Sequence, residues 1–205
     1  MGRVLFGGVI GALIAFVCSF ISWVVLPWHE WTLQPFANQE LVSSVISENV
    51  QKDGVYVIAY PERGQGMPSS TSDEAHIGEE AEASQNRPLV YAQVKKGGLD
   101  HRSSKEHIIS FLTQFIGATL VGIILTNTKK SSYGVRLLVV TVVSLVVGVL
   151  GYIPHWNRFG GGHGLLIVNM ADLVITWFLA GLVMAAVVRP KPEQHIQAVP
   201  QPACQ

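Results

Sequence analysis

Four long apolar stretches limit what this chain can fold into more than any other feature. They are residues 4–28, 108–126, 137–153 and 165–188. A helix needs roughly 20 apolar residues to cross a bilayer core, and lipid offers no hydrogen-bond partner to an exposed backbone group. The sequence therefore predicts an all-α membrane protein, a four-transmembrane-helix bundle, with the lipid bilayer as its first partner.

Charge agrees with this assignment. Charged residues make up 14% of the chain, whereas a soluble domain carries about 25%. The formal net charge is zero, so no basic surface points to nucleic acid as a partner. The first span, residues 1–28, is too long for a secretory signal core and is followed by no small-residue cleavage site, so we expect an uncleaved signal anchor.

Lys and Arg near the ends of the spans predict the orientation. With four crossings, six basic residues at the ends of the spans fall on one side of the membrane: Arg3, Lys129, Lys130, Arg136, Arg189 and Lys191. The other side receives Arg158 and part of the long segment 29–107, whose charges count for little because long loops cross regardless of charge. We therefore expect cytoplasmic N- and C-termini and an extracytoplasmic segment 29–107.

The segment 29–107 predicts a small α/β insertion between helices 1 and 2. Asn38 is a candidate N-cap for an amphipathic helix over about residues 39–50. Residues 55–60 and 89–94 are rich in β-branched and aromatic side chains and predict two strands. Residues 62–88 between them, like the tail 189–205, have the composition of a flexible or disordered segment.

Small residues mark a close-packing face on each span. Gly7 and Gly11 lie four residues apart in the first span, as do Gly181 and Ala185 in the fourth. Such pairs let two helix backbones approach. They serve either packing within a bundle, the simpler interpretation, or dimerisation.

Candidate site residues gather where the spans meet the extracytoplasmic side. Asp172 lies inside the fourth span, with Asn169 one turn closer to that side, and an ionisable residue within a span is a functional candidate by default. The other binding candidates flank the spans: His29, Glu30, His155 and His163. A structural role for Asp172, metal binding, and proton or substrate handling all stay open.

No stronger chemical motif appears. Gly160–Gly164 lacks the Lys-Ser/Thr of a phosphate loop, there is no Gly-x-Ser-x-Gly, and no metal-binding spacing is diagnostic. Cys18 and Cys204 fall in a span and in the tail, so we expect no disulfide. The sequence predicts no cofactor and favours a non-enzymatic role.

Several stretches resemble a family of small, functionally uncharacterised bacterial inner-membrane proteins. They are Leu-Pro-Trp-His at 26–29 with Phe36 and Glu40, Gly-Val-Tyr at 54–56, Ile-Pro-His-Trp-Asn at 153–157, and residues 172–182. The resemblance implies four spans and a bacterial cell-membrane location, and it implies no activity.

Two hypotheses about function follow. The first is an accessory or scaffold subunit that engages a protein partner or a second copy of itself, because the segment 55–60 is apolar on both faces in an insertion too small to cover them. The second is a small transporter, or an ion- or proton-handling protein, built on Asp172 in a cavity shared with Asn169 and with His29 or His155.

Overall fold

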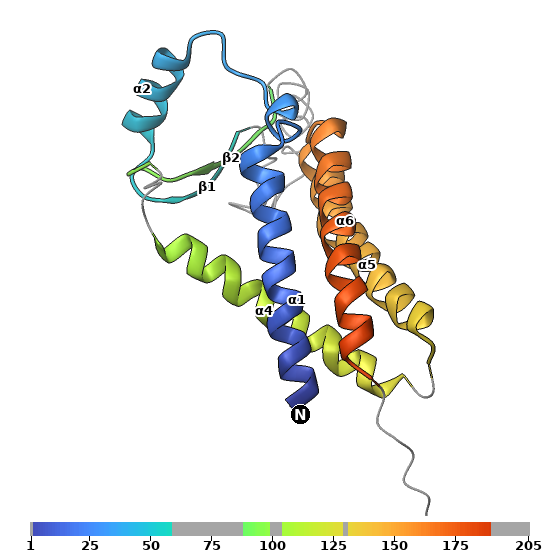
Figure 1. The fold of residues 1–205 in the computed structure, drawn as a ribbon. Helices are drawn as coiled ribbons and strands as arrows, with labels where there is room; N and C mark the ends of the chain where they lie inside the picture. Colours follow the sequence, from blue (N-terminus) through green and yellow to red (C-terminus); the bar gives the residue numbers. More distant parts are fainter. Residues whose placement is uncertain (1, 59–87, 99–103, 129–130, 190–205) are drawn as a thin grey trace, which may run out of the picture. The chain divides into compact units, whose positions relative to one another are not determined.

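The structure of the chain is a computed structural model that describes residues 2–58, 88–98, 104–128 and 131–189. Among these residues, four helices are long and apolar enough to cross a membrane (Figure 1). They are Gly2–Val25, Ser104–Asn127, Tyr133–Phe159 and His163–Val187. The prediction of a four-span membrane protein with a short helix and a two-stranded unit after the first span is therefore confirmed.

The first span changes its helical form before it ends. Helix α1 (Gly2–Phe20) continues as a π-helical turn, η1 (Ile21–Val25), in which the Leu26 N–H donates to the Ile21 carbonyl at 3.0 Å. Leu26 itself is extended, because a residue before proline is driven out of the helical region. The helix thus ends three residues before the predicted boundary at residue 28.

The other three spans are longer than predicted. Helix α4 covers Ser104–Asn127, α5 covers Tyr133–Phe159, and α6 covers His163–Val187. Helix α5 continues through Pro154, where the sequence predicted an end at residue 153. Proline removes one helical hydrogen bond, but that loss does not by itself force a membrane helix to stop.

The chain divides into two compact units, which we describe separately. The membrane unit comprises Met1–Leu26, Lys105–Val147 and Ala171–Gln205. The insert unit comprises Pro27–Ser104 and Gly148–Met170. The boundary between them falls inside helices α5 and α6, so each of these two helices contributes to both units.

Small residues hold the membrane unit together. A Cβ atom added at Gly7 would meet the side chain of Val188, and one added at Gly11 would meet that of Met184, so α1 and α6 approach closely. Gly181 lies in the same way against Val140 of α5. These glycines therefore pack helices within one chain. The core that they surround consists of Ala12, Ala118, Val121, Leu125, Val140, Met184 and Val188.

A buried arginine joins the start of α5 to the end of α6. Arg136, in the first turn of α5, is 9% exposed, and its Nε donates to the Ala185 carbonyl at 2.8 Å. Its Nη1 donates to the Ser131 carbonyl, and the Tyr133 hydroxyl donates to the Leu182 carbonyl at 3.0 Å. The last four carbonyls of a helix have no partner within it, so Arg136 caps the end of α6, and Tyr133 adds a contact about one turn before that end.

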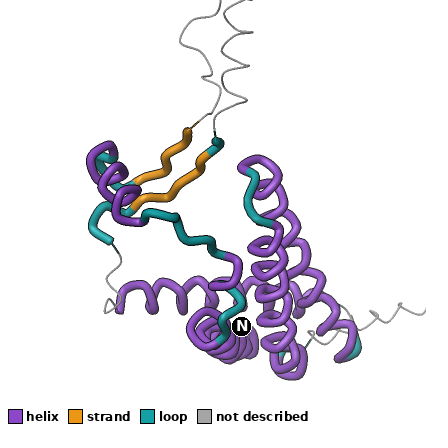
Figure 2. Tube along the Cα trace, turned by 90° about the horizontal axis from the view of Figure 1, so that it is seen from above, coloured by secondary structure: helices purple, strands orange, loops and turns teal. Residues whose placement is uncertain are grey.

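Besides its parts of α5 and α6, the insert unit contains helix α2 (Gln39–Asn49) and a hairpin of β1 (Gly54–Ile58) and β2 (Val90–Val94) (Figure 2). Asn38 is the N-cap, as predicted, and its side chain accepts from the Leu41 N–H at 2.9 Å. The strands pair antiparallel, with Tyr56 opposite Ala92.

The hairpin is tied at the end where the chain enters and leaves it. The Lys96 N–H donates to Asp53 Oδ1 at 2.9 Å, which joins the residue before β1 to one that follows β2. The predicted flexible segment 62–88 and the predicted disordered tail 189–205 lie outside the described residues, apart from Pro88 and Arg189.

Candidate functional site

The six residues proposed from the sequence fall into both units. Asp172 belongs to the membrane unit. The other five belong to the insert unit: His29, Glu30, His155, His163 and Asn169. A cavity lined by Asp172 together with Asn169 and a histidine would draw on both units, and it stays a prediction.

Asp172 is half-buried on α6 and lies next to another polar side chain. The hydroxyl of Thr176, one turn along the same helix, donates to Asp172 Oδ1 at 3.4 Å. Thr176 itself is 5% exposed, so this contact is formed in the interior of the membrane unit.

The contact between Thr176 and Asp172 was not predicted from the sequence. The four-residue spacing of the two residues on one helix was the available signal, because residues four apart on a helix are neighbours. The hydroxyl of Thr119, another polar residue of the spans, is buried against Gly8 of α1.

His155 is part of an aromatic cluster. Its ring lies 5.0 Å from that of Tyr91 and 4.9 Å from that of Phe159, measured between ring centroids, and the rings of Tyr91 and Phe159 are 4.1 Å apart. Tyr91 belongs to β2, and the other two belong to the end of α5. The cluster therefore fastens the hairpin to α5, which gives His155 a packing role.

The remaining candidates do not meet in one place. His163 lies against the ring of Trp156, with 5.2 Å between centroids. His29 is 3% exposed, and its carbonyl accepts from the Thr32 hydroxyl at 2.7 Å. Glu30 is exposed in a short 3-10 turn, and Asn169 is half-buried on α6. Among the described residues, no three His, Cys, Asp or Glu side chains are grouped to hold a metal ion.

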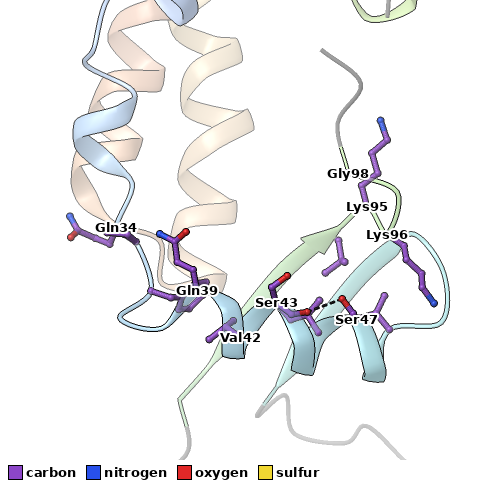
Figure 3. Close-up of a pocket in the computed structure, with 13 residues that line it drawn as sticks. Gln34, Gln39, Val42, Ser43, Ser47, Lys95, Lys96 and Gly98 are labelled. Atoms are coloured by element: carbon purple, nitrogen blue, oxygen red, sulfur yellow. Dashed lines mark hydrogen bonds between the residues drawn. The ribbon is translucent and has the colours of Figure 1, made fainter. Parts of the chain in front are cut away.

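A groove of about 450 Å³, which sequence reasoning did not predict, lies between α2 and the end of β2 (Figure 3). One face of α2 forms its wall, and Val94, Lys95 and Lys96 lie opposite that face. The residues that line it from α2 and its C-cap recur at helical spacing: Gln39, Val42, Ser43, Ile46, Ser47 and the C-cap Val50. None of the six candidates from the sequence lines this groove.

Strand β1 exposes apolar side chains on both of its faces. The side chains of Val55 and Ile58 are 57% and 56% exposed, although they point to opposite faces of the hairpin. β2 is better covered, because Tyr91 packs on α5 and Val94 faces the α2 groove. The hairpin is thus held through β2 and presents β1 outward.

The chain matches no protein-family model, no curated protein and no solved structure. The geometry of the two units therefore carries the functional interpretation by itself.

Proposed function

We propose that this multi-pass membrane protein is a non-enzymatic accessory subunit that binds an extended segment of a partner protein along strand β1. A single observation carries the proposal: β1 is an uncharged strand, exposed on both faces, at the edge of a hairpin that is fastened through β2. The backbone groups along a sheet edge are a template for another strand.

The chemistry of β1 indicates the kind of occupant. Natural edge strands are commonly protected by lysine, proline or a bulge, and the segment Gly54–Ile58 contains no lysine and no proline. An added strand would gain main-chain hydrogen bonds, with apolar contacts from alternate side chains on each face. A two-stranded sheet is marginal alone, so a third strand would also stabilise the insert unit. The partner is therefore expected to offer an extended, uncharged, apolar strand.

Site-specific photo-crosslinking tests the proposal in intact membranes. A photoreactive residue replaces Val55 on β1 or, as a matched control, Leu41 on α2, which is 60% exposed. We expect one discrete heterologous adduct from position 55 and none from position 41. Val57→Lys places a charge on the strand next to the probe and should abolish the adduct, whereas Val45→Lys on α2 should leave it unchanged.

Three results would overturn the proposal. An adduct only to a second copy of the chain would make β1 a homodimer interface. Adducts only to lipid would place the hairpin on the membrane surface. An adduct that persists in Val57→Lys would show that the partner does not use the strand edge.

For location, we propose a bacterial cell membrane with both termini in the cytoplasm. The basic residues beside the spans support this orientation, and the resemblance described in the sequence analysis is the ground for the bacterial location. A reporter that is active only outside the cytoplasm should be active when fused after Ser72 and inactive when fused after Ser131. The opposite pattern would reverse the orientation.

A further inference from the structure

Four helix ends meet within the membrane unit. The contact of Gly7 with Val188 joins the start of α1 to the end of α6, and Arg136 joins the start of α5 to that same end. A Cβ atom added at Gly122, within the last two turns of α4, would lie 3.3 Å from the side chain of Val4. These contacts bring together the starts of α1 and α5 and the ends of α4 and α6.

The charges of the membrane unit are divided between its two ends. Arg3, Arg136 and Arg189 belong to the helix ends that meet, and none of the described residues in the two turns at each of these ends is acidic. In the described part of this unit, the acidic residues are Glu106 in the first turn of α4 and Asp172 in the first half of α6. Both lie toward the opposite ends of their helices. The three arginines therefore define a surface of net positive charge, which we call the basic end.

Arg136 is a buried cation that has no acidic partner among the described residues. It is 9% exposed, and its described hydrogen bonds go to the neutral carbonyls of Ala185 and Ser131. The end of α6 offsets about half a positive charge, but the start of α5 adds about half, so the guanidinium charge stays close to one. A buried charge is costly until a counter-charge approaches it. The basic end is thus suited to an anion.

We propose that the basic end binds the phosphate of an anionic phospholipid through Arg136, with Arg3 and Arg189 adding to the attraction. The occupant is a lipid because these arginines stand at the ends of membrane-spanning helices, where headgroups lie. A guanidinium has five N–H donors in a planar fork that fits phosphate oxygens. Arg3 and Arg189 are exposed and can reach a headgroup. This surface lies in the membrane unit and does not depend on a partner at β1.

The test is a lipid titration of the purified full chain in a non-ionic detergent, followed by native mass spectrometry. The two probes are dioleoylphosphatidylglycerol and dioleoylphosphatidylcholine, which share their acyl chains and differ in headgroup charge. We expect phosphatidylglycerol to bind at least about tenfold more tightly. It should also raise the temperature of unfolding more than phosphatidylcholine does, because a ligand of the folded state stabilises that state.

Removing single charges from the two ends of the unit locates the binding surface. Arg189→Gln should lower the preference for phosphatidylglycerol about fivefold, because one basic residue near a membrane surface contributes about that factor. Lys105→Gln is the matched control, because Lys105 is exposed in the first turn of α4, away from the basic end. It should leave the preference unchanged.

Variants at Arg136 and around it separate lipid binding from the structural cap. Arg136→Gln should remove most of the preference and the additional stabilisation by phosphatidylglycerol, whereas loss of the cap alone would lower stability equally in both lipids. Because Arg136→Gln also weakens the fold, the double variant Arg3→Gln/Arg189→Gln tests the same surface with the cap intact. It should lose more of the preference than Arg189→Gln alone.

Three outcomes would overturn the phospholipid site. Equal binding of the two lipids would show that headgroup charge is not recognised. Equal losses in Lys105→Gln and Arg189→Gln would make the attraction a property of the whole protein. A full preference in the double variant, or in a folded Arg136→Gln variant, would show that the basic end does not hold the phosphate.

Discussion

The membrane unit and the insert unit stabilise themselves by different means. In the described part of the chain, every buried hydrophobic residue except Val50 belongs to the membrane unit. In that unit, glycines let neighbouring helices approach closely, and a buried arginine donates a hydrogen bond to the end of α6. The insert unit relies on a cap, a hairpin and one aromatic cluster. The difference is that buried apolar side chains form the core of the first unit, whereas the second leaves the apolar side chains of β1 exposed.

The largest expected effect is the loss of the arginine cap. Arg136→Met removes two hydrogen bonds from a charged group and leaves the Ala185 carbonyl without this donor, so we expect a loss of about 3 kcal/mol in the free energy of unfolding. Unfolding in mixed micelles as SDS is added gives the value. Arg189→Met, at an exposed position, is the control. If Arg136→Met and Arg189→Met lower the free energy of unfolding by the same amount, the Arg136 cap does not stabilise the membrane unit.

A smaller effect is expected when the contact between α1 and α6 is overfilled. Gly11→Ile drives a branched side chain into Met184, and overpacking costs about 2 kcal/mol. Gly134→Ile serves as the matched variant, because nothing lies within 4 Å of a Cβ at that position. The same unfolding measurement applies. A Gly11→Ile variant as stable as Gly134→Ile would mean that the close approach of these helices is not required.

In the insert unit the effects should be smaller and local. Asn38→Ala removes the N-cap of α2 and should destabilise that helix by about 1 kcal/mol, while Asn38→Ser should recover most of the loss. Amide hydrogen exchange over residues 39–49 measures the change. Faster exchange that spreads to α1, which belongs to the membrane unit, would contradict a local effect.

The smallest effect is expected at the base of the hairpin. Asp53→Ala removes the acceptor of the Lys96 N–H, an exposed contact for which we expect about 0.5 kcal/mol. Exchange at the Lys96 amide should accelerate, and Asp53→Asn should restore the wild-type rate because it keeps the acceptor oxygen. No acceleration in Asp53→Ala would show that strand pairing alone holds the hairpin.

The sequence predicted the two kinds of element that depend on local pattern. Long apolar runs predicted the four spans, and Asn38 predicted the start of α2, because membrane spans and helix caps are determined by residues that are close in the sequence. Two predicted helix ends were less accurate. Helix α5 continues through Pro154, past its predicted end, whereas the first span ends before Pro27 and does not reach Trp28. Local pattern alone does not distinguish these two cases.

The candidate site was harder to predict because it depends on contacts between distant residues. Asp172 is conspicuous as a charge in an apolar run, but the residue that contacts it, Thr176, is an ordinary residue in a span. The contacts of the His155 ring with Tyr91 and Phe159 join distant parts of the chain and could not be predicted from local pattern. Arg136, interpreted from the sequence only as an orienting charge, is buried and donates hydrogen bonds to the carbonyls of Ala185 on α6 and of Ser131.

The reach of Arg136 also has a consequence for how the protein is made. Its acceptor on Ala185 is 49 residues later in the chain. At about 5–20 residues per second, the ribosome needs roughly 2–10 seconds to supply that carbonyl after Arg136 itself has been joined. During this interval the guanidinium has no helix end to cap, so the start of α5 should stay in the hydrated headgroup layer. Once α6 has been synthesised, the Ala185 carbonyl can accept a hydrogen bond from Arg136. We therefore expect this contact between α5 and α6 to form late in biosynthesis.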